Sequence, residues 1–420
     1  MIKRIEKIFN VAMLFYTSGA ILSLFVGGAN RISVEAGDSQ LLALQLVFYG
    51  VALCFIAIRW RTMVRSAWNV RWIIAYVLVA MASSAWSVYP SFTLRRAIAL
   101  AATTAFGIYF GTRYSVREQL EILAWTCFAI AVVSLFFVFV FPGYGIDHIE
   151  HVGDWKGVFD QKNVLARMMI LGTLVFVALP GRGSRIQTVK AAGISVCLLL
   201  VFMSGSRTAL LVGLILFAAM LPFRALRLPF TASIPILLTI TGIGIVLVVS
   251  VLGNSSALLD LMGRSSNLTG RTELWTAVWA AARTHPWLGF GYSAFWTGLT
   301  GPSRSVLAQV QWVTPHSHNG LLDVCLDLGA VGVLLLGASY FTGMLNATRA
   351  YLKHTSFGCT WPLMFLVFLF LYNFTESAIP RANSILWILY VACVVAATRM
   401  VKSGLTPTVL PIESHVGNAR

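Results

Sequence analysis

The sequence predicts an all-α integral membrane protein with about twelve transmembrane helices and one long loop outside the bilayer. Hydrophobic residues make up 58% of the 420 positions and charged residues only 11%, and the mean hydropathy is +0.80. The apolar residues gather in segments of about 20, the length at which a helix crosses the hydrocarbon layer. A single water-soluble core cannot bury so much apolar surface, which excludes an ordinary soluble protein.

Helices are expected for these segments because a helix satisfies its own backbone hydrogen bonds where water is absent. The predicted spans are 9–28, 41–58, 72–88, 96–112, 119–141, 164–180, 190–204, 207–223, 230–252, 320–342, 360–375 and 383–399. The first span is too long for a signal-peptide core and no small-residue cleavage site follows it, so we expect it to be retained.

Both termini are predicted to be cytoplasmic. An even number of spans puts them on one side, and that side collects 19 of the 31 lysines and arginines. The positive-inside rule assigns this side to the cytoplasm. The net charge of +16 then reflects topology, and nucleic-acid binding is excluded because it requires one clustered basic face in water.

These assignments divide the chain into spans 1–9 (residues 1–252), an outer loop (253–315), spans 10–12 (316–402) and a cytoplasmic tail (403–420). Within the loop, apolar residues recur at helical spacing between Gly270 and Arg283, and they include Trp275 and Trp279. We expect an amphipathic helix that lies along the membrane interface, where indole rings prefer to sit, as part of a lid on the outer leaflet.

Neither a metal site nor a cofactor site is predicted. The six cysteines lie in or beside apolar spans without a CxxC pair, and are interpreted as buried hydrophobes. Gly289-Phe290-Gly291 lacks the third glycine of a nucleotide-binding fingerprint and is interpreted as a turn. His316 and His318, two residues apart, would need other ligands to hold zinc.

The segment His316-Ser317-His318-Asn319-Gly320 stands where the long loop enters the predicted span 320–342. It places imidazoles at the outer mouth of an apolar helix, where a histidine can take up a proton near neutral pH. A boundary histidine bonded to a backbone carbonyl is the alternative. Chemistry at a membrane surface is therefore the first hypothesis for this segment.

Several motifs together resemble the O-antigen ligase and polymerase family of bacterial envelopes, the Wzy-C superfamily. They are the segment 270–275, the segment 285–291, and His318-Asn319-Gly320 with Gly329 beyond it. The segments 154–163 and 373–377 are more similar to the ExoQ-type exopolysaccharide polymerase branch than to the lipid A core ligases.

The resemblance implies a metal-independent membrane glycosyltransferase of the broad GT-C kind, whose donor is an undecaprenyl-pyrophosphate-linked oligosaccharide. Membrane lipid and a chain-length regulator or co-polymerase are the other expected partners, and no cofactor is expected. The match also implies an outward arginine, Arg207, that holds the pyrophosphate.

Residue chemistry suits this reaction, because the departing pyrophosphate must be neutralised and an acceptor hydroxyl deprotonated. Guanidinium groups bind phosphate oxygens in a bidentate fork, and a histidine accepts a proton. The candidate catalytic residues are His318 and Glu376. The candidate substrate-binding residues are Arg207, Arg271, Lys162, Asn163 and His316.

Each candidate has an alternative that needs no chemistry. Arg207 anchors its helix at the headgroups, Arg271 is a solvated first-turn residue, and Lys162 and Asn163 are a snorkelling pair. For Glu376 the alternative is an ion pair with Arg381. The predicted topology nevertheless places all these candidates, from distant stretches of sequence, on the outer face.

The sequence therefore predicts an enzyme that polymerises lipid-linked repeat units into exopolysaccharide at the periplasmic face of the bacterial inner membrane. A ligase that joins polysaccharide to a lipid A core or a protein is the alternative, and differs only in the acceptor. A lipid-linked sugar flippase or carrier is disfavoured, because transporters place ionisable residues near the middle of spans and most centres here are apolar.

Overall fold

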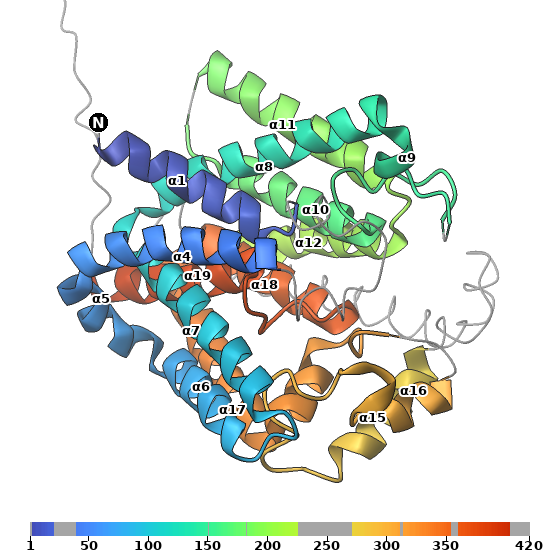
Figure 1. Cartoon of the computed structure of the whole chain (residues 1–420). Helices are drawn as coiled ribbons and strands as arrows, with labels where there is room; N and C mark the ends of the chain where they lie inside the picture. The colour runs from blue at the N-terminus through green and yellow to red at the C-terminus, as the bar shows by residue number, and fades with distance from the viewer. Residues whose placement is uncertain are drawn as a thin grey trace, which may run out of the picture.

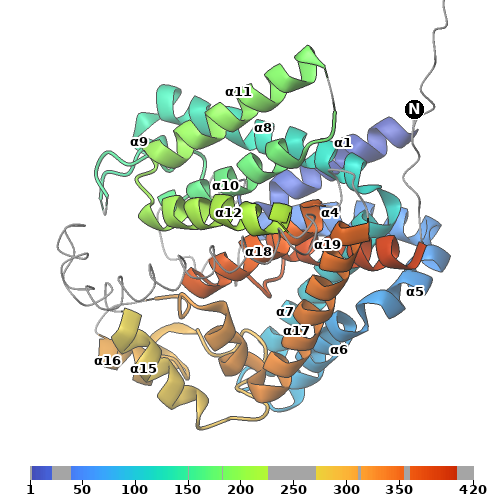
Figure 2. The ribbon, with the colours of Figure 1, turned by 180° about the vertical axis from the view of Figure 1, so that it is seen from behind.

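The computed structural model describes residues 2–20, 39–149, 151–181, 183–225, 271–310, 314–353 and 360–403. Regular structure in these ranges is helical, without a β-strand, and Ile146 and Trp155 form one isolated bridge. The helices pack side by side into one bundle (Figures 1 and 2). The predicted all-α class is therefore confirmed for the described residues.

Eleven of the predicted spans fall on helices. These are α1 (Ile2–Thr17), α4 (Ser39–Ile58), α6 (Arg71–Ala82), α7 (Pro90–Arg113), α8 (Val116–Val140), α10 (Lys162–Ala178), α11 (Ser184–Met203), α12 (Arg207–Ala225), α17 (Gly320–Lys353), α18 (Thr360–Thr375) and α19 (Ile385–Ser403). The ninth span, 230–252, lies outside the described residues, as do the first part of the outer loop and most of the tail. The number of membrane crossings thus stays a prediction.

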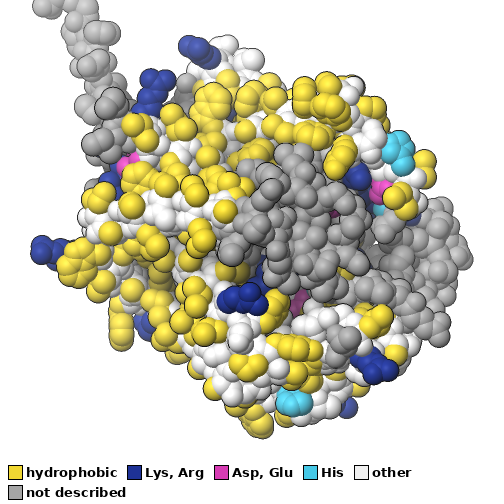
Figure 3. Space-filling model, viewed as in Figure 1, with side chains coloured by type: hydrophobic (Ala, Val, Ile, Leu, Met, Phe, Trp, Pro, Cys, Tyr) yellow, Lys and Arg dark blue, Asp and Glu magenta, His cyan; other side chains and the backbone are white. Residues whose placement is uncertain are grey.

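A membrane location agrees with the helix lengths and with the surface. Five helical stretches in the described ranges are long and apolar enough to cross a bilayer, among them Val116–Val140 and Gly320–Lys353. Hydrophobic side chains cover much of the face over α1, α4 and α8 (Figure 3). The chain is a multi-pass membrane protein.

The core of the bundle is built around α19, which packs against α7, α17 and α18. Most of this helix is buried, including Trp387 and Tyr390. The two polar groups of these side chains are satisfied, because the Trp387 indole donates to Thr104 (2.8 Å) and the Tyr390 hydroxyl to Ser339 (2.7 Å). Apolar surface and satisfied hydrogen bonds together fix α19 in the middle of the fold.

Charged contacts gather at two ends of the bundle. At one end, here called the inner end, buried Glu6 accepts from Arg113 (2.9 Å) and from the Tyr109 hydroxyl (2.6 Å). At the other, the outer end, lie the candidate site residues. The assignment of the inner end to the cytoplasm is a prediction from the positive-inside rule.

The segment 59–71 connects the predicted spans 41–58 and 72–88, and it is helical rather than an irregular loop. It forms the helix α5 (Trp60–Ala67), followed by the 3-10 turn η1 (Trp68–Val70). Its basic residues lowered its hydropathy below that of a span. One face of α5 is nevertheless apolar enough to pack on the bundle, with Met63 buried.

The segment 316–342 also differs from the prediction of one continuous span, because α17 is broken at Gly329 (φ 59°, ψ −153°). The backbone of segment 286–291 is inserted at this break, where Phe290 N donates to Leu326 O (2.8 Å) and Ala330 N to Pro286 O (2.8 Å). A Cβ at Gly329 would lie 2.4 Å from the carbonyl carbon of Trp287. Segment 289–291 is non-helical, with a bend at Phe290 between turns at 286–288 and 292–293. Its hydrogen bonds attach the outer loop to α17.

The predicted loop helix is confirmed as α15 (Arg271–Ala282), and a second helix, α16 (Arg304–Val310), packs against it. The apolar face of α15 is buried inside the protein, with Leu274 and Val278 fully covered. Trp279 is 47% exposed, whereas the Trp275 indole donates to Ser317 O (2.9 Å). Trp275 therefore holds the histidine segment, and the contact of α15 with the membrane interface remains a prediction.

Candidate functional site

The histidine segment is shaped by the start of α17. The side chain of Asn319 caps this helix, since its Oδ1 accepts from Leu321 N (3.0 Å) and Leu322 N (3.3 Å). Directly before the cap, His318 has a φ of 53°, a left-handed conformation that non-glycine residues adopt rarely. Such a conformation is maintained only when the surroundings enforce it, and it is frequent at functional sites.

Hydrogen bonds to Asp323 help to hold the histidine segment in this conformation. Asp323 Oδ1 accepts from Ser317 N (3.1 Å) and from the Trp296 indole (2.9 Å), and its Oδ2 accepts from the Ser377 hydroxyl. This carboxylate therefore joins the histidine segment, the outer loop and the segment after α18. The sequence analysis missed Asp323, although an acidic residue in the first turn of an apolar helix was a visible signal.

The segment after α18 is fixed by Asn373, whose Oδ1 accepts from Ala378 N (3.1 Å) and Ile379 N (3.0 Å). This side chain lies against Gly320, where a Cβ would approach Asn373 Oδ1 to 2.0 Å. Gly320 thus allows α17 and α18 to meet closely. The close approach places the Asn319-Gly320 and Asn373 motifs side by side, and it brings Glu376 beside the histidines.

His318, Glu376 and Arg271 form one group at the outer end. His318 Nδ1 lies 3.0 Å from Glu376 Oε2, and Arg271 Nη2 lies 3.5 Å from Glu376 Oε1. All three side chains are partly buried, with exposed fractions of 23% for His318 and Arg271 and 14% for Glu376. Glu376 therefore pairs with His318 and Arg271, whereas Arg381, its alternative partner from the sequence, is exposed.

The carboxylate of Glu376 is kept ionised by its neighbours. Burial alone would raise its pKa, but the hydrogen bond with His318 and the positive charges of His318, Arg167 and Arg271 outweigh burial and hold the pKa below its ordinary value. A carboxylate in this position orients the imidazole and stabilises it when it takes up a proton.

Arg167 is a residue that the sequence analysis missed. It is the only charged residue in the predicted span 164–180, it is partly buried on α10, and α10 packs against α18. Its charge acts on Glu376. An ionisable residue inside an apolar span is a functional candidate by default, and this signal was present in the sequence.

His316 takes a supporting position in the structure. Its Nδ1 accepts from the backbone N–H of His318 (3.2 Å), and the two ring planes are inclined at 68° with centroids 4.2 Å apart. This contact helps to hold His318 in its left-handed conformation. The substrate-binding role expected for His316 stays a prediction.

His316, His318 and Glu376 place potential ligand atoms within 4.8 Å of one another. The further ligand that zinc would require beside the two histidines is therefore supplied by the fold, which the sequence analysis did not foresee. Two features oppose a cation here: both Nδ1 atoms already contact protein groups, and Arg271 and Arg167 act on the same carboxylate. Metal independence remains a prediction that requires a direct test.

Lys162 and Asn163 belong to a second group. Lys162 Nζ lies 2.5 Å from Asp154 Oδ2, and the Ser206 hydroxyl donates to Asn163 Oδ1 (2.8 Å). Arg207 is exposed and begins α12 directly after Ser206. This group joins the segment 154–163 to the start of α12, and Asp154 is the residue in it that the sequence analysis did not single out.

The two groups are connected by α10. Asn163 and Arg167 are four residues apart, so they lie on the same face of this helix. Asn163 contacts the turn before Arg207, whereas the charge of Arg167 acts on Glu376. The structure thus brings His318, Glu376 and Arg271 together directly, and places Lys162, Asn163 and Arg207 in a neighbouring group.

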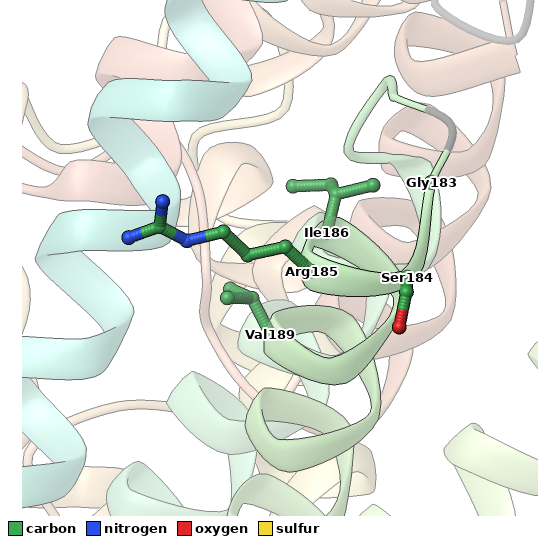
Figure 4. Close-up of a pocket in the computed structure, with 5 residues that line it drawn as sticks. All are labelled: Gly183, Ser184, Arg185, Ile186 and Val189. Carbon is green, nitrogen blue, oxygen red and sulfur yellow. The ribbon is translucent and has the colours of Figure 1, made fainter.

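Two open hollows differ in their relation to these groups. One of about 410 Å³ lies at the start of α11, lined by Gly183, Ser184, Arg185, Ile186 and Val189 (Figure 4). None of these is a candidate site residue. Another of about 360 Å³ lies between α15 and α16, lined by Thr272, Glu273, Thr276 and Gln309. It offers polar side chains next to Arg271.

Comparison with known proteins agrees with this geometry. Residues 192–337 match the model of the family described as O-antigen ligase. The match includes Arg207, Arg271, His316 and His318, whereas Lys162, Asn163 and Glu376 lie outside it. The chain is also 27% identical over 346 residues to the exopolysaccharide production protein ExoQ of Rhizobium meliloti (strain 1021), which covers 79% of this chain and 76% of that protein.

The relative extends the similarity well beyond the residues of the family match. It is an exopolysaccharide production protein, as the motifs in segments 154–163 and 373–377 led us to expect. Both comparisons therefore confirm the resemblance predicted from the sequence: the chain is similar to the O-antigen ligase and polymerase family, and within it to the ExoQ type.

Proposed function

We propose that this protein polymerises undecaprenyl-pyrophosphate-linked oligosaccharide repeat units into exopolysaccharide at the periplasmic face of the inner membrane. The observation that carries the proposal is the 3.0 Å contact between His318 and Glu376 beside Arg271, at the outer end of a membrane bundle. This group combines a proton acceptor, His318, with a cation, Arg271. Glycosyl transfer from a pyrophosphate requires both, one to deprotonate the acceptor hydroxyl and one to neutralise the leaving group.

In the proposed reaction a sugar hydroxyl of the acceptor attacks the anomeric carbon of the donor. The new glycosidic bond forms as the bond between that carbon and the pyrophosphate oxygen breaks, and the electron pair leaves with the lipid pyrophosphate. The hydroxyl proton passes to His318. General-base catalysis of this kind contributes about 10²- to 10⁴-fold in rate.

Glu376 is proposed to position His318 and to stabilise its protonated form. If Nδ1–H of His318 donates to Glu376 Oε2, the lone pair that accepts the proton is on Nε2. This division between a base and an orienting carboxylate also operates in the Ser-His-Asp triad.

Arg271 is proposed to bind the leaving pyrophosphate together with Arg207. A guanidinium carries five N–H donors in a fork, and the contact of Arg271 with Glu376 is long, at 3.5 Å. Arg271 can therefore face the carboxylate and a phosphate at once. Lys162, Asn163 and Arg207 would then hold the donor from α10 and α12.

A ligase is the second candidate, because the family match carries the description O-antigen ligase. The two activities are separated by reconstituting the purified protein in nanodiscs with a lipid-linked repeat unit and no other acceptor. A polymerase produces a ladder of lipid-linked oligomers from this substrate alone. A ligase produces none until a lipid A core or an acceptor protein is added, and that result would replace the polymerase assignment.

Replacing Glu376 by glutamine should lower turnover about 10²-fold or more, because the imidazolium then lacks its counter-charge. The double variant His318→Ala/Glu376→Gln should be no slower than His318→Ala alone, since a residue that acts through His318 has no effect in its absence. Turnover of the purified lipid-linked substrate measures both. Multiplied effects in the double variant would show that Glu376 acts independently of His318.

Chelators should leave the activity of the purified enzyme unchanged. EDTA and 1,10-phenanthroline are added to the reconstituted protein, and turnover and bound metal are measured together. We expect less than a stoichiometric amount of metal and no loss of rate, because cations already surround Glu376. Reversible inactivation that zinc restores would assign the His316, His318 and Glu376 cluster to a metal ion instead.

A further inference from the structure

An exposed apolar ridge runs along α5 and the turn that follows it. Its members are Trp60 and Val64 on α5, Trp68 at the start of η1, and Trp72 in the first turn of α6. Trp60 and Val64 are four residues apart and so lie on one face of α5. Their exposed fractions are 58%, 63%, 70% and 36%. The opposite face is buried, with Met63 and Ser66 covered, so the ridge is the side that α5 presents to its surroundings.

Arginines flank this ridge. Arg61 and Arg65 are both exposed and one turn apart, and the guanidinium of Arg61 lies 5.6 Å from the centre of the Trp60 ring. Arg71 lies 5.8 Å from the Trp68 ring and 5.5 Å from the Trp72 ring. Cations beside indole rings make this surface both basic and aromatic.

Neighbouring carboxylates do not neutralise this charge. Glu6, a buried carboxylate at this end of the bundle, pairs with Arg59 and Arg113. Within the described residues, Arg61 and Arg65 form no ion pair with a carboxylate. The surface therefore keeps a net positive charge of at least two that an external anion can meet.

α5 lies at one side of the bundle, away from the outer-loop helices. In both views it is on the opposite side from α15 and α16 (Figures 1 and 2). The chain turns at Arg59, between the apolar helix α4 and α5. Lys402, near the end of α19, donates to Asn69 (2.6 Å) and ties the following turn to the bundle. Hydrophobic and basic side chains lie side by side along this edge (Figure 3).

We propose that α5 and its following turn form a binding surface for anionic glycerophospholipids of the cytoplasmic leaflet. The tryptophan ridge lies at the boundary between headgroups and acyl chains, where indoles are enriched. Arg61 and Arg65 bind the lipid phosphates, which a guanidinium recognises through paired hydrogen bonds. This surface is separate from the His318 site, so it does not depend on the proposed reaction.

The test compares two double variants of the full-length protein that remove the same charge. Arg61→Gln/Arg65→Gln removes the cations of α5, and Arg283→Gln/Arg304→Gln removes two exposed arginines of the outer loop. Arg283 is a matched control because it also lies over an indole, 5.6 Å from the centre of the Trp279 ring. Fluorescent phosphatidylglycerol is titrated into the detergent-solubilised protein, and the same probe with a phosphatidylcholine headgroup serves as the neutral comparison.

We expect Arg61→Gln/Arg65→Gln to weaken phosphatidylglycerol binding by about fivefold for each arginine, and to leave phosphatidylcholine binding unchanged. The control variant should stay within about twofold of wild type. Hydrogen exchange of residues 59–72 should be slower in phosphatidylglycerol nanodiscs than in phosphatidylcholine nanodiscs. Unchanged affinity in the α5 variant, an equal loss in the control, or equal exchange in the two lipids would overturn the proposal.

Discussion

Replacing His318 by alanine should lower polymer formation by about 10²- to 10⁴-fold while the protein remains folded in the membrane. The rate falls because the acceptor hydroxyl loses its base. The fold should persist because Glu376, whose charge would otherwise be buried alone, keeps Arg271 and Arg167 as positive neighbours. Turnover of a lipid-linked substrate measures the rate, and thermal unfolding in detergent measures the stability.

His316 provides the matched control for this experiment. His316→Ala removes the acceptor for the backbone N–H of His318, which costs about 1 kcal/mol, or about fivefold in rate. The neighbouring imidazole should therefore matter far less than His318. Normal chain length with His318→Ala, or equal losses with the two alanines, would end the general-base assignment.

Replacing Arg271 by lysine should lower turnover by about 10- to 100-fold, although the charge is kept. Lysine presents a point charge and cannot form the paired hydrogen bonds that a guanidinium makes with phosphate. The same change at Arg207 should have a similar effect if that residue also holds the pyrophosphate. Each rate is measured with purified lipid-linked substrate in nanodiscs, and reporter fusions confirm that the topology is unchanged.

Arg283→Lys is the control for anchoring at the headgroups. This exposed arginine follows α15 and its side chain lies over the Trp279 ring, so lysine should serve equally well there. The double variant Arg207→Lys/Arg271→Lys should depart from the product of the single effects if both side chains bind one pyrophosphate. Rates near wild type for both single variants would return the two arginines to an anchoring role.

The sequence was informative where local patterning decides the structure. Apolar segments of sufficient length predicted eleven helices that the structure contains, because a span must satisfy its own hydrogen bonds wherever it lies. The periodicity of segment 270–283 predicted α15 in the same way. It did not reveal α5, because arginines between apolar residues lower the hydropathy of a helix that lies at the surface of the bundle.

The residues of the candidate site also divide into those that the sequence predicted and those that it did not. His318, Glu376 and Arg271 were identified from motifs, and the distribution of basic residues predicted that they lie on one side of the membrane. Asp323 and Arg167 were passed over, because each is a single charged residue in an apolar helix. The groups that each one acts on are known only from the folded structure.

By itself, the sequence determined the all-helical class and the family resemblance, and it predicted a topology with the candidate site on the outer face. Only the tertiary structure decided that Glu376 pairs with His318 and Arg271 rather than with Arg381. That choice depends on the close approach of Gly320 to Asn373 and on the carboxylate of Asp323. The contacts of Glu376 with His318 and of Asp323 with Ser377 join residues more than fifty positions apart, and spacing along a chain cannot specify distances across a packed interior.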